Sequence, residues 1–243
     1  MAELWEIYDD VRASLSRFVT ELAPPALETT VPATPEWTVK DVVAHLTGDA
    51  TCVIAGDFPS EFFAAFGEEQ AVAALNRWTA QQVAERRDRP LQDVLSEWDA
   101  SADKLVSMMK GEAWPAGVPP FATYVLLTDL AVHQQDIYGT LGIERDRDDA
   151  PVKIGVAAYA TGVDLRLRNA GVGTLHLEAN GKTWTAGDGD PVAAVRASRF
   201  EFFRALSGRR SPEQVAGYDW EGDPQPFIEY FYPYGIRPEA LVE

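Results

Sequence analysis

The sequence predicts an α+β protein in which a helical N-terminal part precedes a small mixed α/β part. Three observations carry this expectation. Apolar residues recur at helical spacing up to about residue 142, a charged segment ending in proline (IERDRDDAP) follows, and alternating runs then flank Asn180-Gly181. We therefore expect a helical domain at residues 1–145 and an α/β domain at residues 151–243. Strands should be confined to the second domain.

The N-terminal helices are expected to form an antiparallel bundle of four main helices with a long crossover. One helix start is well specified, because Thr38 and Asp41 form a variant of the capping box while Trp37 and Val42 can form a hydrophobic staple. The segment TTVPATPEW before it is expected to be a loop. The helices are predicted at residues 3–22, 38–55, 68–87, 90–110 and 128–142, with a short one within 57–67.

The C-terminal part should begin with a helix at residues 151–168. The runs VGTLHLEA and KTWTAG alternate on both sides of Asn180-Gly181, which is a strong hairpin signal. His176 falls on the polar side of the first run, so we expect it to be exposed and not to be a ligand. Residues 191–207 return to helical spacing, and a further helix should start at Ser211.

Composition excludes several classes of partner. The chain has 243 residues, is 46% hydrophobic and 24% charged, and carries a formal net charge of −17. This charge argues against nucleic acid and anionic membranes as partners, and an anionic substrate would need a local arginine. No apolar run approaches the roughly 20 residues of a membrane span. The N-terminus lacks the order of a signal peptide, and the single cysteine, Cys52, fits a reducing cytoplasm.

The most informative stretch is TDLAVHQQDIYGTLG, in which Asp129, His133 and Asp136 lie at positions i, i+4 and i+7. In a helix these three side chains fall inside an arc of roughly 60°. Apolar residues flank that arc, and the opposite side, with Gln134, Gln135 and Tyr138, is expected to face solvent. Buried carboxylates and imidazoles need partners. A metal ion and a salt-bridge network without metal are both consistent with this helix.

A second histidine lies on the apolar face of its own helix. His45 is followed by Asp49 at i+4 and Cys52 at i+7, so the three share one side. A lone histidine on an apolar face is more often a core residue than a ligand, and Cys52 is most simply a small buried hydrophobe.

Three segments resemble one known family. PEWTVKDVVAHLTG, TDLAVHQQDIYGTLG, and ALSGRRSPEQV followed by DWEGDP resemble, in this order, the signatures of the mycothiol-dependent maleylpyruvate isomerase family, within the DinB/YfiT-like superfamily. The resemblance implies a DinB-like four-helix bundle. It also implies a divalent metal, with zinc expected, held by His45, Asp129 and His133. Where the isomerase pattern has Glu, this chain has Asp129, which is one methylene shorter and can alter metal position, affinity or identity.

The resemblance also implies mycothiol, or another low-molecular-weight thiol, as a second cofactor. Three protein ligands leave a position open, and a thiol that coordinates zinc is deprotonated. Such a thiolate isomerises an electron-poor double bond if it adds, permits rotation and leaves; if it stays, the outcome is S-transfer. The partners would be this thiol and a small electrophile, in a monomer or homodimer. Cys52 is a weaker alternative source of the thiol, because no neighbouring base or cation is evident.

Three further residues are candidates for catalysis or cofactor binding. Asp136 either orients a ligand histidine or moves a proton, or simply makes a structural hydrogen bond. Arg209 and Arg210 follow Gly208 at a predicted helix end, where arginines interact favourably with the helix dipole. Alternatively, they bind a carboxylate or oxygens of the thiol cofactor at a cleft between the domains. Two other functions remain open: a non-catalytic ligand- or metal-binding protein that retains the fold, and a hydrolase that uses a metal-bound water.

Overall fold

The chain divides into two units, each with its own apolar interior. The computed structural model describes residues 2–243. The helical unit comprises residues up to 64 and residues 73–145, together with Glu243, and the α/β unit comprises residues 65–72 and 146–242. The protein is therefore a mixed α and β structure, as the sequence predicts.

The helical unit contains seven helices and two short strands among the residues described. Its elements are α1 (Leu4–Thr20), α2 (Pro24–Leu27), β1 (Thr30–Val31), β2 (Thr34–Thr38), α3 (Val39–Ile54), α4 (Ser60–Ala64), α5 (Glu69–Ala84), α6 (Leu91–Met109) and α7 (Ala122–Thr140). Helix α5 starts in the segment that is grouped with the other unit. The helices predicted at residues 3–22, 68–87 and 90–110 are confirmed within a few residues at their ends.

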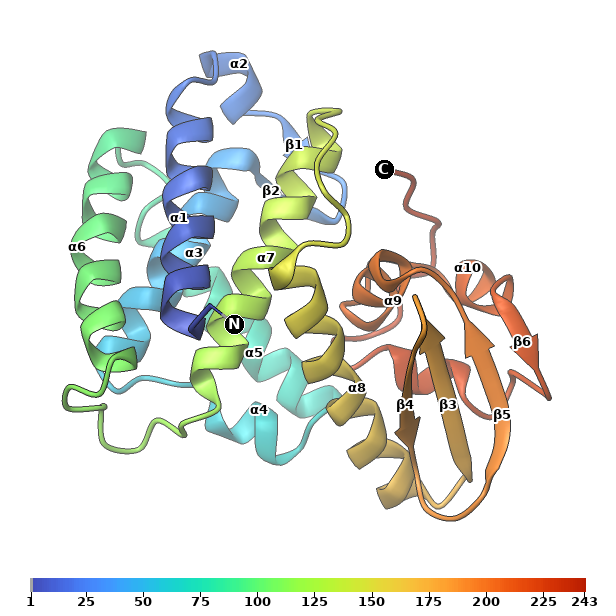
Figure 1. Ribbon diagram of the computed structural model, residues 1–243. Coiled ribbons are helices and arrows are strands. Elements are labelled where there is room, and N and C mark those ends of the chain that lie inside the picture. Colours follow the sequence, from blue (N-terminus) through green and yellow to red (C-terminus); the bar gives the residue numbers. More distant parts are fainter. Residues whose placement is uncertain (1) are drawn as a thin grey trace. The chain divides into compact units, whose positions relative to one another are not determined.

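Four long helices build the apolar interior of this unit. Helix α1 packs against α6 and α7, and α3 packs against the same two helices (Figure 1). Trp98 of α6 is fully buried. Each of the four helices also buries leucine side chains, among them Leu15, Leu46, Leu105, Leu127 and Leu130. This packing places α3 directly beside α7, which matters because each carries one of the predicted metal-binding histidines.

The start of α3 follows from its sequence. Thr38 accepts a hydrogen bond from the Asp41 backbone N–H at 3.2 Å, and the Asp41 carboxylate accepts one from the Thr38 N–H at 3.0 Å, so the predicted capping box is confirmed. Arg87 also donates to Asp41, at 3.0 Å. These contacts fix where α3 begins, and hence the rotation that turns His45 inwards.

The prediction that strands occur only in the C-terminal part is wrong. Strands β1 and β2 form a small antiparallel sheet within the segment expected to be a loop. Val31 is fully buried, and burial of this β-branched side chain stabilises the pairing despite the two prolines of the segment. Proline is tolerated where its missing N–H is not needed by the ladder, as at the edge of so short a sheet. The sheet delivers Trp37 to the start of α3.

The predicted solvent face of α7 is also wrong. Gln134, Gln135 and Tyr138 are buried, like nearly every residue from Leu126 to Tyr138. The Tyr138 ring meets Phe18 edge-on, with ring centroids 5.1 Å apart, and Gln134 donates to the Tyr138 hydroxyl at 3.2 Å. Buried amides are tolerated when they are hydrogen-bonded, so an amphipathic pattern can belong to a central helix.

The α/β unit is a four-stranded sheet with helices. Its elements are α8 (Ala150–Ala170), β3 (Thr174–Ala179), β4 (Lys182–Ala186), β5 (Pro191–Arg196), α9 (Arg199–Leu206), α10 (Pro212–Ala216), β6 (Asp219–Glu221) and η1 (Ile228–Phe231). The strand order is β4-β3-β5-β6 (Figure 1). The predicted hairpin is confirmed, with positive φ angles of 49° at Asn180 and 76° at Gly181, as a tight two-residue turn requires. His176 is half-buried rather than exposed.

The helix predicted at residues 191–207 is only half right. Residues 191–196 form β5, which runs parallel to β3 and antiparallel to β6, and only residues 199–206 are helical. Ser198 starts that helix by accepting a hydrogen bond from the Glu201 N–H. The segment PVAAVR has a spacing that suits either structure, and pairing with strands on both sides decides it. Among residues 2–243, no helix combines the length and hydropathy needed to cross a membrane.

Candidate metal centre

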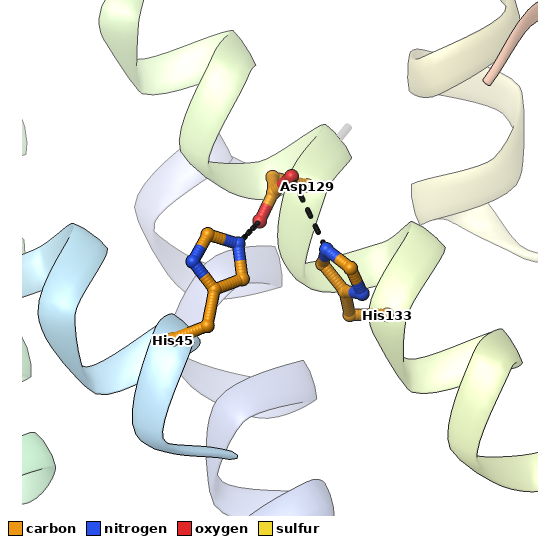
Figure 2. A group of neighbouring side chains, drawn as sticks. All are labelled: His45, Asp129 and His133. Atoms are coloured by element: carbon orange, nitrogen blue, oxygen red, sulfur yellow. Dashed lines mark hydrogen bonds and ion pairs between the residues drawn. The ribbon is translucent and has the colours of Figure 1, made fainter. Parts of the chain in front are cut away.

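The structure brings the three predicted ligands together in the helical unit. His45 projects from α3, while Asp129 and His133 project from successive turns of α7 (Figure 2). One ligand atom from each residue lies within 4.8 Å of the other two. The Asp129 carboxylate is between the histidines, with Oδ2 3.1 Å from Nε2 of His45 and Oδ1 3.7 Å from Nε2 of His133. No other group of this kind occurs among the residues that the structure describes.

A polar side chain lies beside the outer nitrogen of each imidazole. Nδ1 of His45 lies 2.8 Å from Oε1 of Gln82 on α5, and the Gln82 amide nitrogen donates to Asp49 at 3.0 Å. Nδ1 of His133 lies 3.0 Å from Oδ2 of Asp136, which is an ion-pair distance without hydrogen-bond geometry. Both rings therefore turn Nε2 towards Asp129. This arrangement, with the outer nitrogen occupied and the inner nitrogen facing a common point, is typical of histidines that bind metals.

The cluster is covered on one side and accessible on another. The indole of Trp37 lies against both imidazoles, with centroid distances of 5.0 Å to His45 and 5.9 Å to His133. The two imidazoles themselves meet edge-on at 4.9 Å. Their side chains are only 3% and 6% exposed, whereas the Asp129 side chain is 31% exposed. Solvent therefore reaches the cluster beside Asp129.

The buried charges shift the pKa values of the two histidines in opposite directions. Burial by itself would lower the pKa of His45, but the carboxylates of Asp49 and Asp129 outweigh burial and raise it to about 9. Burial lowers the pKa of His133, and the nearby His45 adds to this effect. Burial raises the pKa of Asp49 to about 7. Without a metal, the two carboxylates therefore favour the charged form of His45 at neutral pH.

The donor set fits a divalent metal ion. Two imidazole nitrogens and one carboxylate oxygen are ligands of the type that zinc and neighbouring transition metals accept. Nε2 of His45 and Oδ2 of Asp129 already face one another at 3.1 Å where a cation would bind, and each imidazole has a polar group beside its outer nitrogen. His45, Asp129 and His133 would hold such an ion.

The two predicted arginines lie in the α/β unit. Arg210 is buried and makes a two-pronged ion pair with Glu201, in which Nε and Nη2 donate at 2.8 and 2.9 Å. Its Nη1 donates to the Arg209 carbonyl at 2.9 Å. Arg209 is half-buried and donates to the Ser207 carbonyl. Glu201 thus fixes the plane of the Arg210 guanidinium, and the predicted binding role of both residues stays a prediction.

Two residues that contact the cluster, Gln82 and Trp37, could not be assigned to it from the sequence. Gln82 lies on a predicted helix, but only the packing of α5 against the residues around His45 reveals its contact. Trp37 was expected only as a hydrophobic staple. Burial raises the pKa of the Cys52 thiol to about 11, which makes Cys52 the weaker candidate for the thiol.

Comparison with known proteins identifies the family. The sequence pattern of the mycothiol maleylpyruvate isomerase N-terminal domain matches residues 8–138, more than half of the chain. Two crystal structures of the mycothiol-dependent maleylpyruvate isomerase, one of them a histidine-to-alanine mutant, share the fold. The mutant has a TM-score of 0.58 at 12% identity and the other structure 0.54 at 14%, each covering 91% of this chain and 96% of theirs. No curated protein sequence matches. This chain belongs to the family defined by the mycothiol maleylpyruvate isomerase N-terminal domain.

Proposed function

We propose that this protein is a metal- and thiol-dependent isomerase, with S-transfer as the alternative outcome of the same chemistry. Its second cofactor would be mycothiol or another low-molecular-weight thiol, and its substrate a small electrophile. The observation that carries the proposal is the convergence of His45, Asp129 and His133 on one point beside solvent, in a chain of this family.

The three side chains would act as ligands through Nε2 of His45, Nε2 of His133 and the carboxylate of Asp129. A divalent ion held there, with zinc as our first choice, would supply an open position at which an external thiol is ionised and made nucleophilic. His45 must give up its Nε2 proton to become a ligand, and Asp129 is the carboxylate that this proton faces. Asp129 is also the most exposed of the three, which favours approach of thiol and substrate from its side.

The surrounding residues would keep the ligands in place. Asp136, whose side chain is inaccessible to solvent and lies 3.0 Å from Nδ1 of His133, would direct Nε2 of that ring inwards. Trp37 keeps water from the faces of both imidazoles. Arg209 and Arg210 are our candidates for binding an anionic group of the substrate or the thiol, and Glu201 would set the plane of the Arg210 guanidinium for that task.

The decisive test is a thiol-dependence assay. Protein loaded with zinc, manganese or nickel is incubated with a panel of electrophiles, among them cis-configured conjugated acids, with and without mycothiol. We expect turnover that requires both the metal and the thiol. An isomerase leaves the thiol concentration unchanged, whereas an S-transferase consumes one thiol for each substrate. Turnover without thiol would favour a hydrolase that uses a metal-bound water, and no turnover on metal-loaded protein would favour a non-catalytic binding protein.

The chain offers a matched control for the ligand variants. His133→Ala should abolish metal binding and turnover together. His176→Ala removes the histidine on β3, which has no part in the cluster, and should leave both unchanged. Equal activity in the two variants would contradict the proposed site.

A further inference from the structure

Gln82 lies beside the cluster without offering a ligand to it. Its side chain is buried between His45 and Asp49, and both ends of its amide are hydrogen-bonded. We propose that Gln82 is a positioning residue that fixes His45 with its proton on Nδ1, so that Nε2 is the nitrogen available to a metal. This inference rests on the proposed function, because it concerns how one of the proposed ligands is prepared.

The orientation of the amide follows from Asp49. When Asp49 is ionised, its carboxylate only accepts hydrogen bonds, so the group of Gln82 that faces it at 3.0 Å is the NH₂. The carbonyl oxygen then has to face His45, where it lies 2.8 Å from Nδ1. A carbonyl oxygen also only accepts, so Nδ1 must carry a proton. In the neutral ring the lone pair is therefore on Nε2, which faces Asp129.

Gly48 of α3 leaves the space in which the Gln82 side chain reaches His45. Gly48 lies one turn after His45, and a Cβ atom built on it would meet Cβ of Gln82 at 2.4 Å and Cγ at 2.7 Å. Real Cβ atoms do not approach so closely, so any other residue at this position would push the Gln82 side chain or helix α5 away. Gly48 has ordinary helical geometry, so no turn requires a glycine there. We therefore infer that the absence of a side chain at this position leaves space for Gln82.

A second contact anchors the helix that carries Gln82. The backbone carbonyl of Gln82 accepts a hydrogen bond from Nη1 of Arg86 at 2.9 Å, and Nη2 of the same arginine donates to Glu97 of α6 at 2.6 Å. Arg86 is buried. The helix turn that presents the amide is therefore tied to α6 as well as fitted against α3, which suits a residue that must hold a fixed direction.

The test compares Gln82→Met with Gln81→Met at pH 8. Methionine keeps the approximate length of glutamine but cannot hydrogen-bond. Gln81 is the exposed neighbour on the same helix, bonded only to Glu85 among the contacts that the structure gives, so its variant controls for the substitution itself. Zinc affinity is measured by competition with a chromophoric chelator. We expect Gln82→Met to bind zinc about 10–100-fold more weakly, the loss typical of such outer contacts, and Gln81→Met to match the wild type.

Two further measurements keep the proposal falsifiable if Gln82→Met folds poorly. Gly48→Ala retains every polar group but should weaken zinc binding in the same direction, because the new methyl group displaces Gln82. Nitrogen-15 NMR of the wild type shows directly which ring nitrogen is protonated: we expect the proton of His45 on Nδ1 in zinc-loaded protein, and also in zinc-free protein at pH 10.

The outcomes separate this inference from the proposed function. Wild-type zinc affinity in a folded Gln82→Met, or a His45 proton on Nε2, would overturn the positioning role while leaving the metal site intact. A wild type that binds no zinc, manganese or nickel would overturn the metal-dependent function itself. In that case the tautomer in zinc-free protein still decides whether Gln82 sets the state of His45.

Discussion

Zinc should raise the thermal stability of the wild type but not that of His133→Ala. The substitution removes one of three proposed ligands and leaves the other two, His45 and Asp129, on different helices. Since a metal that binds only the folded state stabilises it, the loss of binding appears as a loss of the zinc-dependent shift in Tm. His176→Ala should retain the full shift.

The magnitude follows from the burial of the site and from mass action. Zinc buffered at 1,000 times its Kd stabilises the folded protein by about 4 kcal/mol. For a chain of this size, each kcal/mol moves the Tm by roughly 2–4 °C, so zinc should raise the wild-type Tm by about 8–16 °C. His133→Ala also loses stability without zinc, by about 2–4 kcal/mol, because it empties a buried position and removes the contact to Asp136 at 3.0 Å.

Differential scanning calorimetry with chelator-buffered zinc measures both effects. If the scan contains more than one transition, the transition to follow is the one that moves with zinc in the wild type. The reasoning would be refuted by a zinc-dependent shift in His133→Ala equal to that of His176→Ala. A variant that is destabilised without zinc but still responds fully to it would mean that His133 is a core residue only.

The remaining predictions concern charge. Glu97→Ala should lower the free energy of unfolding in urea by about 2–4 kcal/mol, because it removes the carboxylate that lies 2.6 Å from the buried Arg86. Glu85→Ala removes an exposed carboxylate 3.5 Å from the same arginine and should cost at most about 1 kcal/mol. Zinc affinity should rise up to about tenfold per pH unit between pH 7 and 9, because the proton on His45, with its pKa raised to about 9, competes with the metal; a flat profile would contradict this. In the zinc-free protein, the thermal stability should fall over the same pH range. The raised pKa of His45 contributes stability that is fully present below pH 6.5 and lost as the pH rises through 9, so its Tm should fall over that range.

The sequence predicts the helices well because each carries its own periodic apolar face. It also predicts that Asp129, His133 and Asp136 share one side of α7, since this depends only on helical spacing. The pairing of His45 with that side does not follow from spacing, because it requires α3 and α7 to pack together. Here the resemblance to a family supplied the expectation, and the structure supplies the contact between the helices.

What the sequence could not predict depends on tertiary neighbours. The small sheet that carries Trp37 forms in a proline-containing segment because Val31 finds a buried position. Gln134 is buried although its pattern favoured solvent, because Tyr138 satisfies its amide. Residues 191–196 become a strand because β3 and β6 lie on both sides of them. Gln82 matters only because Gly48 lets it reach His45.

The central claim is that His45, Asp129 and His133 bind one metal ion. X-ray absorption spectroscopy of the zinc-loaded protein tests it most directly. The account predicts one zinc per chain with only nitrogen and oxygen ligands in the absence of thiol, two imidazoles at about 2.0–2.1 Å, and a loss of one imidazole in His133→Ala. A zinc environment without imidazole scattering, or a wild-type spectrum retained in His133→Ala, would contradict it.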